Sequence, residues 1–166
     1  MNIKLMVFDL DGVLTNGKIL LINEGEWIRQ MDIKDGYAIQ LALKSGIEIA
    51  VVSGSHSNQV GQRLKKLGVE VFIQGVSNKS THLLNLMQKY LIQKENILYM
   101  GDDIPDLDAF AVAGVNACPA DAAEDVKVSA DFISLKNGGD GCVREIIEKV
   151  LRVQDKWQIN KTIKAI

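Results

Sequence analysis

The stretch KLMVFDLDGVLT, residues 4–15, is an apolar run that stops at two aspartates and a glycine. An apolar run without polar alternation predicts a buried strand of a parallel sheet, covered on both faces. Carboxylates at the end of such a strand lie in the crevice where open α/β sheets bind ligands. Strand alternation predicts that the side chains of Asp9 and Asp11 leave on the same side, and Gly12 lets the chain bend away. The alternative is that the two acids serve only as a helix cap and a turn residue.

The rest of the chain alternates between short apolar runs and amphipathic segments. We expect further strands at residues 47–52, 69–73, 97–100, 115–118 and 132–135. Helices are predicted between them, at residues 35–45, 58–67, 80–91, 107–113, 122–128 and 142–153. This βα alternation predicts a doubly wound, mainly parallel α/β sheet with right-handed crossovers. We expect one domain over residues 1–153 and a C-terminal tail, residues 154–166, that is disordered without substrate.

Residues 17–33 interrupt the first strand-to-helix crossover. Two β-rich runs around an Asn/Glu/Gly turn predict a β-hairpin insertion. Its apolar side chains exceed what a solvated ribbon needs: Ile19, Leu21, Trp27, Ile28 and Met31. The hairpin should therefore pack on something, either on its own domain or on another subunit.

Composition excludes several classes of protein. The 166 residues carry a net charge of −2 with scattered basic residues, which argues against a nucleic-acid partner. We expect no membrane span, because no apolar run reaches the roughly 18 residues that one needs. The two cysteines, Cys118 and Cys142, lack metal-site spacing and look like core residues. A cytoplasmic location is the expectation.

Polar residues collect at one predicted edge of the sheet, where strands end or helices begin. They are Asp9, Asp11, Ser53, Lys79, Asp102, Asp103 and Asp106. Packing several carboxylates together raises their pKa values and is destabilising unless a cation neutralises them. A group of hard oxygen ligands is what Mg²⁺ selects, usually through one or two carboxylates, waters and substrate phosphate oxygens.

This arrangement resembles the haloacid dehalogenase-type phosphatases, whose four motifs occur here in order. They are FDLDGVLT (residues 8–15), VSG (residues 52–54), Lys79 and GDDIPD (residues 101–106). The match runs through most of the chain, and four ordered motifs are far more specific than a lone DxDG.

The resemblance implies a role for each motif residue. Asp9 is the nucleophile that forms an aspartyl-phosphate, and Asp11 protonates the leaving alcohol and then deprotonates water. Mg²⁺ is held by Asp9, Asp102 and the backbone carbonyl of Asp11. Ser53 and the Gly54 amide bind the phosphoryl group, and Lys79 offsets the negative charge.

Two further acids of the GDDIPD motif, Asp103 and Asp106, have an indirect role in the same resemblance. They orient the metal-bound waters and Lys79 instead of binding the metal themselves.

The chain lacks room for a separate cap domain. The hairpin, the segments KDG (34–36) and QGVSNK (74–79), and GGDGCVRE (138–145) are similar to the subfamily acting on 3-deoxy-D-manno-octulosonate 8-phosphate. Relatives act on nine-carbon sialic-type sugar acid 9-phosphates. The resemblance implies a small sugar phosphate substrate and a homotetramer in which the hairpins form a central barrel and each protomer helps to cover its neighbour's site.

One departure from that subfamily concerns substrate recognition. Ser55 stands where an arginine usually follows the motif glycine, and a bidentate Arg is the best partner for a sugar-acid carboxylate. Lys34 and Arg63, with His56 as a further candidate, are the basic residues left for binding substrate.

Two functions of other classes stay open at this point. A phospho-accepting receiver domain also combines a small doubly wound sheet, clustered acids, Mg²⁺ and a late lysine, but its accepting aspartate ends the third strand. Here that strand ends at Ile73-Gln74-Gly75, without an acid. The other alternative is a catalytically silent interaction module, which intact motifs alone do not exclude.

Overall fold

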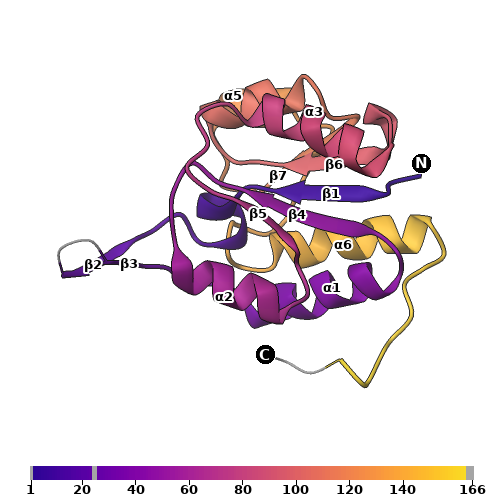
Figure 1. The fold of residues 1–166 in the computed structure, drawn as a ribbon, viewed down its shortest axis with the longest axis horizontal. Helices are drawn as coiled ribbons and strands as arrows, with labels where there is room; N and C mark the ends of the chain where they lie inside the picture. The colour runs from indigo at the N-terminus through magenta and orange to yellow at the C-terminus, as the bar shows by residue number, and fades with distance from the viewer. Residues whose placement is uncertain (1, 24–25, 164–166) are drawn as a thin grey trace.

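The computed structural model describes residues 2–23 and 26–163. A six-stranded parallel sheet forms its centre (Figure 1). In spatial order the strands are β5 (Val71–Ile73), β4 (Glu48–Val52), β1 (Leu5–Phe8), β6 (Ile97–Met100), β7 (Val115–Cys118) and β8 (Phe132–Ile133). The predicted doubly wound α/β class is confirmed. β1 lies between β4 and β6, and its four residues are fully buried there.

Helices cover both faces of the sheet, as Figure 1 shows. One face carries α1 (Ile33–Lys44), α2 (Asn58–Lys66) and α6 (Cys142–Val153); the other carries α3 (Lys79–Tyr90), α4 (Leu107–Phe110) and α5 (Glu124–Ser129). Alternation along β1 feeds two separate cores: Met6 and Phe8 pack with α1 and α6, whereas Leu5 and Val7 pack with α3 and α5. The first strand therefore anchors both layers.

Several predicted boundaries move. The helix expected from residue 35 begins at Ile33, because the side chain of Asp32 caps it by accepting a hydrogen bond from the Lys34 amide, 2.7 Å away. The helix expected over residues 107–113 ends at Phe110 and follows a short 3-10 turn, Ile104–Asp106. Central strands 97–100 and 115–118 and the helix 142–153 have the predicted bounds.

Asp9 and Asp11 line the same pocket, as expected, but strand alternation is not the reason. The strand ends at Phe8, and residues 10–14 form a tight helical turn with non-helical dihedrals at Asp11 and Gly12. A turn, and not a continued strand, therefore places Asp11.

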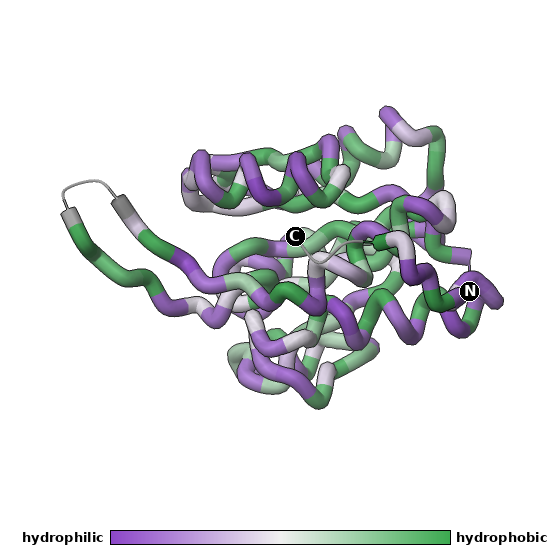
Figure 2. Tube along the Cα trace, turned by 90° about the horizontal axis from the view of Figure 1, so that it is seen from below, coloured by the Kyte–Doolittle hydropathy of each residue, from purple (hydrophilic) through white to green (hydrophobic). Residues whose placement is uncertain are grey.

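The predicted hairpin is present and projects away from the sheet. Its strands are β2 (Leu20–Asn23) and β3 (Glu26–Ile28), paired antiparallel. Figure 2 shows hydrophobic segments along this projecting ribbon. Leu20 and Leu21 are 60% and 66% exposed, and Trp27 is 51% exposed. Packing of these three side chains on the hairpin's own domain, one of the two expectations, is therefore not seen, whereas Met31 does pack against the core.

The C-terminal tail differs from the expected disorder over residues 154–163. Trp157 packs against the core beside Arg144, and Ile163 is buried. The Tyr37 hydroxyl accepts a hydrogen bond from the Asn160 amide at 3.1 Å. The tail lies against α1 and α6 because its own Trp157 and Ile163 side chains pack on the core there. No described helix is long and apolar enough to cross a membrane.

Candidate active site

Three central strands and one helix start bring the polar residues together. Asp9 follows β1, Ser53 follows β4, Asp102 lies two residues after β6, and Lys79 is the first residue of α3. The carboxyl ends of parallel strands meet at one edge of a sheet, which explains the convergence. These four residues line a pocket of about 450 Å³, together with Asp11, Gly54, Asp103 and Asp106.

Gly12 allows the turn after β1 to approach Asp102 closely. Its φ is +93°, a conformation that residues with a side chain rarely adopt. A Cβ atom there would lie 2.0 Å from Oδ2 of Asp102. The turn thus requires glycine at this position for two reasons: the backbone has a positive φ, and the neighbouring Asp102 carboxylate leaves no room for a side chain.

Lys79 bridges two carboxylates inside the pocket. Its Nζ donates to Oδ1 of Asp9 at 2.8 Å and to Oδ1 of Asp106 at 2.6 Å, and all three side chains are at most 9% exposed. Burial lowers the pKa of Lys79, but the two carboxylates outweigh this and raise it, so the ammonium stays charged.

Asp106 holds Lys79 in place instead of facing the pocket freely. Oδ1 of Asp106 accepts from the Tyr99 hydroxyl at 2.5 Å as well as from Lys79. Oδ2 accepts from the backbone amides of Asp102 and Asp103, at 2.9 and 3.3 Å. Both oxygens are occupied, which suits the indirect role expected for this residue. Burial and neighbouring carboxylates raise the pKa of Tyr99, which keeps its hydroxyl a donor.

The donor set fits a hard divalent cation. Carboxylate oxygens of Asp9, Asp102 and Asp106 lie within 4.8 Å of one another. Because both oxygens of Asp106 are engaged by protein donors, Asp9 and Asp102 are the acids with oxygens left for a metal. Within residues 2–23 and 26–163, no hydrogen bond reaches the Asp102 carboxylate. Burial and the charges of Asp9 and Asp106 raise its pKa to about 8, and burial and Asp106 raise that of Asp9 to about 6. Such accumulated negative charge is what a cation relieves.

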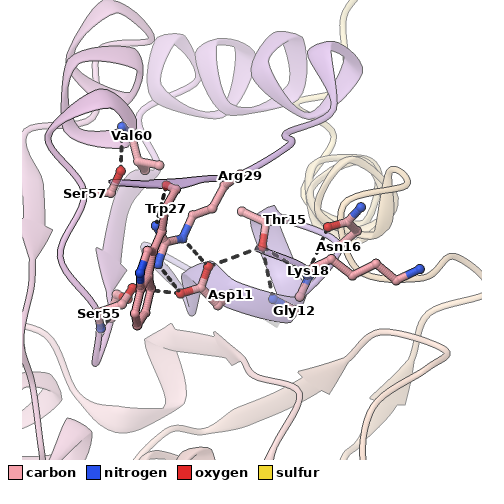
Figure 3. Close-up of polar contacts among 12 residues, drawn as sticks. Asp11, Gly12, Thr15, Asn16, Lys18, Trp27, Arg29, Ser55, Ser57 and Val60 are labelled. Carbon is pink, nitrogen blue, oxygen red and sulfur yellow. Dashed lines mark hydrogen bonds and ion pairs between the residues drawn. The ribbon is translucent and has the colours of Figure 1, made fainter. Parts of the chain in front are cut away.

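Asp11 faces the same pocket from a different set of contacts, drawn in Figure 3. Arg29 donates to both of its oxygens, at 2.6 and 3.1 Å, and the Ser55 hydroxyl donates at 2.7 Å. Burial raises the pKa of Asp11, but the hydrogen bonds from Arg29 and Ser55 outweigh it and hold the pKa below its ordinary value. Arg29 was not singled out from the sequence, where a lone arginine in a hairpin reads as a surface residue.

Ser53 and Ser55 form one corner of the pocket. Ser53 is 1% exposed, its Oγ lies 3.0 Å from Oγ of Ser55, and it accepts from the Ser55 amide at 3.1 Å. Gly54 is exposed beside them. A hydroxyl and backbone amides at this place suit an anionic oxygen.

The expected substrate-binding residues Lys34 and Arg63 do not line this pocket. Lys34 is exposed on the first turn of α1. Arg63 lines a neighbouring pocket of about 510 Å³ under the hairpin, where its Nη2 is buried without a hydrogen-bond partner in the described chain. Asp103 is exposed and caps the 3-10 turn through the Ile104 amide.

Gly138 and Gly139 pack tightly against the DxDG turn. A Cβ on Gly138 would lie 1.8 Å from the carbonyl oxygen of Gly12, and Gly139 donates its amide to the Val13 carbonyl at 3.0 Å. The pair thus lets the loop before α6 contact the turn that carries Asp11.

This sheet carries two aspartates after β1, a serine, a lysine and a further acid pair at its carboxyl edge, and these are the features of a haloacid dehalogenase-type phosphatase. The sequence model of the haloacid dehalogenase-like hydrolases matches residues 69–146. The 3-deoxy-D-manno-octulosonate 8-phosphate phosphatase of Escherichia coli is 37% identical over 155 residues, covering 93% of this chain and 82% of that protein. The Haemophilus influenzae enzyme is 35% identical over 161 residues, 97% of this chain and 89% of that protein.

Solved structures of similar fold include phosphatases of the same name. The phosphatase of the same name from Yersinia pestis superposes with a TM-score of 0.91 at 33% identity, covering 93% of this chain and 84% of that one. The Moraxella catarrhalis enzyme, solved with magnesium, phosphate and a KDO molecule, gives 0.89 at 37% identity, covering 92% and 88%. The chain therefore belongs to the 3-deoxy-D-manno-octulosonate 8-phosphate phosphatase family of haloacid dehalogenase-like hydrolases, and it is a phosphatase. This membership decides against the receiver-domain and silent-module alternatives.

Proposed function

We propose that this phosphatase hydrolyses the phosphate monoester of a 2-keto-3-deoxy sugar acid, with 3-deoxy-D-manno-octulosonate 8-phosphate as the preferred substrate. The observation that carries the proposal is the shared pocket of Asp9, Asp11, Ser53, Lys79 and Asp102. The similarity to relatives with this substrate in their names supports the choice of sugar acid.

Two carboxylates carry out the two parts of the reaction: Asp9 attacks phosphorus and Asp11 transfers protons. The Asp9 carboxylate attacks phosphorus, forming an aspartyl-phosphate, while the ester bond to the sugar oxygen breaks. Asp11, whose pKa is held below its ordinary value by Arg29 and Ser55, first takes up a proton from solvent and gives it to that leaving oxygen. In the second half it takes a proton from the water that cleaves the acyl phosphate. Lys79, held by Asp106 and hydrogen-bonded to Asp9, fixes the rotation of the nucleophile and offsets the charge of the phosphoryl group.

The phosphoryl oxygens have donors at the end of β4. The Ser53 hydroxyl and the Gly54 amide bind them, and the positive Lys79 ammonium lies across the same pocket. Asp103 at the rim orients metal-bound water, as expected from the sequence.

Mg²⁺ is the proposed cofactor, held by Asp9, Asp102 and the backbone carbonyl of Asp11. It supplies positive charge that screens the repulsion between an anionic nucleophile and an anionic phosphate. The hard oxygen donors and the raised pKa values of Asp9 and Asp102 support this choice, and a relative contains the same ion.

Nine-carbon sugar acid 9-phosphates form a second candidate substrate class. The observation that favours them is Ser55, which lines the pocket at the sequence position where we expected an arginine for an octulosonate enzyme. Ser55 donates its hydroxyl to Asp11 instead of offering a cation to the substrate carboxylate. A pocket without that guanidinium has more room for a longer sugar.

The experiment is a phosphate-release assay with octulosonate 8-phosphate and the nine-carbon 9-phosphates side by side. We expect release that EDTA abolishes and added Mg²⁺ restores, and none above background with Asp9→Asn. The higher kcat/KM between the two substrate classes identifies the natural one. A metal-loaded, assembled protein that releases no phosphate from any sugar phosphate would contradict the proposal.

A homotetramer is the proposed assembly, in a cytoplasmic setting. The exposed apolar side chains of β2 and β3 support it, because a solvated ribbon gains nothing from Leu20, Leu21 and Trp27 in water. The two cysteines are free and buried, which suits a reducing compartment.

A further inference from the structure

Arg29 connects the base of the hairpin to the active-site turn. It follows β3 directly, and its Nε and Nη2 donate to the two oxygens of Asp11 at 2.6 and 3.1 Å, a bidentate pair (Figure 3). Its Nη1 donates to the Trp27 carbonyl at 3.3 Å, and the guanidinium lies 5.9 Å from the centre of the Trp27 ring. The side chain of Arg29 is 2% exposed, so its guanidinium is shielded from water.

The Asp11 carboxylate is held from three segments of the chain. Arg29 reaches it from the hairpin and Ser55 from the loop after β4, while Thr15 contributes a longer contact of 3.5 Å from its own turn. Asp11 is nevertheless 32% exposed and lines the pocket. A carboxylate on a tight turn has several rotamers available, and these contacts select one of them.

The neighbouring segments hold the base of the hairpin on that turn. Met31 forms an isolated antiparallel bridge with Thr15, and the Gln30 side chain accepts from Asn16 at 3.4 Å. The position of Arg29 is therefore coupled to the position of the whole hairpin.

Recognition of the substrate carboxylate is the competing role for this arginine. Three of its nitrogens already donate within the protein, and only 2% of the side chain is exposed. An external anion would have to displace Asp11 to form its own bidentate pair. The contacts favour a role that acts through Asp11.

We infer that Arg29 is a positioning residue for proton transfer: it orients the Asp11 side chain toward the leaving oxygen, and Asp11 takes up a proton from solvent before it acts as the acid. The position of the hairpin therefore controls the acid step. The inference rests on the acid role proposed for Asp11. An arginine is suited to this task because its planar fork fixes both oxygens of a carboxylate, whereas a lysine would fix one.

The test compares two phosphate esters that differ in their need for an acid. The leaving group of an alkyl ester such as the sugar phosphate is an unstable alkoxide, which needs a proton from an acid. The leaving group of p-nitrophenyl phosphate is a stable phenolate, which does not. In the assembled protein with Mg²⁺, we expect Arg29→Met to lower kcat on the sugar phosphate by about 10²-fold and on p-nitrophenyl phosphate by less than about 3-fold. KM should change little, and Arg29→Lys should recover part of the loss.

Two further variants make the outcome decisive. Arg152→Met removes an exposed ion pair with Glu148 on α6 and should leave both activities unchanged. Asp11→Asn should show the same dependence on leaving group as Arg29→Met, more strongly. Circular dichroism and the oligomeric state of each variant establish that it is folded and assembled.

The possible results separate the two claims. Equal losses on both esters, or no loss on either, with Arg29→Met would overturn the positioning role while Asp11→Asn still shows the dependence. If Asp11→Asn itself shows no such dependence, the acid role of Asp11 fails, and the inference about Arg29 fails with it. If Arg29→Met does not fold, Arg29→Lys still tests the inference. A lysine variant with wild-type activity on the sugar phosphate would overturn the positioning role of Arg29.

Discussion

Lys79 and Asp9 form an ion pair inside the active-site pocket: Nζ of Lys79 lies 2.8 Å from Oδ1 of Asp9, and each side chain is 9% exposed. Two groups removed from water in this way are tolerated only when each neutralises the other and further donors complete the network. Asp106 and Tyr99 provide that completion behind Lys79. The same contacts that stabilise the pair also fix the direction of Asp9, the proposed nucleophile.

Replacing this lysine should therefore affect activity and stability together. In Lys79→Met two buried carboxylates lose their cation, and breaking a buried pair costs about 3–5 kcal/mol. We expect a fall in kcat of at least about 10²-fold and a lower urea midpoint. The control is Lys127→Met, which removes an exposed pair with Glu124 and should cost less than about 1 kcal/mol. Similar urea midpoints for the two variants would contradict the stabilising role of the Lys79 network.

Gly12→Ala should disturb the site through a clash as well as through its backbone. Gly46→Ala is a matched control, because Gly46 also has a positive φ, +75°, but no atom lies within 4 Å of its Cβ position. Both variants should lose about 1 kcal/mol from the strained dihedral. We expect the larger destabilisation and a loss of phosphate release only in Gly12→Ala, since its methyl group displaces Asp102. Full activity in a folded Gly12→Ala protein would show that the turn can move aside.

Asp35 should make stability depend on pH. It is 2% exposed, its Oδ1 accepts from the Arg144 amide at 2.7 Å, and its Oδ2 has no partner in the described chain. Burial raises its pKa from 3.8 to about 7, so the folded state binds a proton that the unfolded state releases. Its contribution to stability is therefore full below about pH 4 and decreases as the pH rises to about 7, by up to ~4 kcal/mol.

Asp35→Asn tests this dependence, because an amide oxygen can still accept from Arg144 but does not ionise. Urea unfolding of wild type and variant between pH 5 and 8 should give curves that diverge as the pH rises, with the variant the more stable at pH 8. Asp125→Asn, at an exposed position of α5, should leave the difference flat. A difference for Asp35→Asn that does not change with pH would rule out a raised pKa for this group.

A charge on the hairpin should dissociate the proposed tetramer without unfolding the protomer. Leu21, 66% exposed on β2, is the site for a Leu21→Asp variant. We expect a smaller species by light scattering, with an unchanged circular dichroism spectrum, because a carboxylate is expensive to bury in an apolar interface. Leu91→Asp is the control, since Leu91 is 91% exposed at the end of α3, away from the hairpin. A Leu21→Asp protein that assembles like the wild type would remove the hairpin from the interface.

Much of the architecture could be predicted from local patterns. Uninterrupted apolar runs identified the central strands, and β6, β7 and α6 have the expected bounds. The strand-end rule then placed Asp9, Ser53 and Asp102 at one edge, where they line one pocket. The helix start at Ile33 was missed because an Asp32 cap and a strand end look alike in a short polar segment.

Contacts between distant segments could not be read in this way. In the sequence Tyr99 looks like a core residue of an apolar strand. Only the structure shows that its hydroxyl donates to Asp106, the carboxylate that also holds Lys79. Asp35 opens a predicted helix like any capping acid, and only the packing of α1 against α6 shows that it is buried.

Arg29 illustrates the difference most clearly. Apolar periodicity and turn residues act over a few neighbours, so they specify strands, helices and the edge where their ends meet. The bidentate contact between Arg29 and Asp11 depends on how the hairpin lies across that edge, and the bridge between Thr15 and Met31 holds the base of the hairpin there. The class of reaction thus follows from residues adjacent to strand ends, whereas the orientation of Asp11, the proposed proton donor, follows from the position of the hairpin in three dimensions.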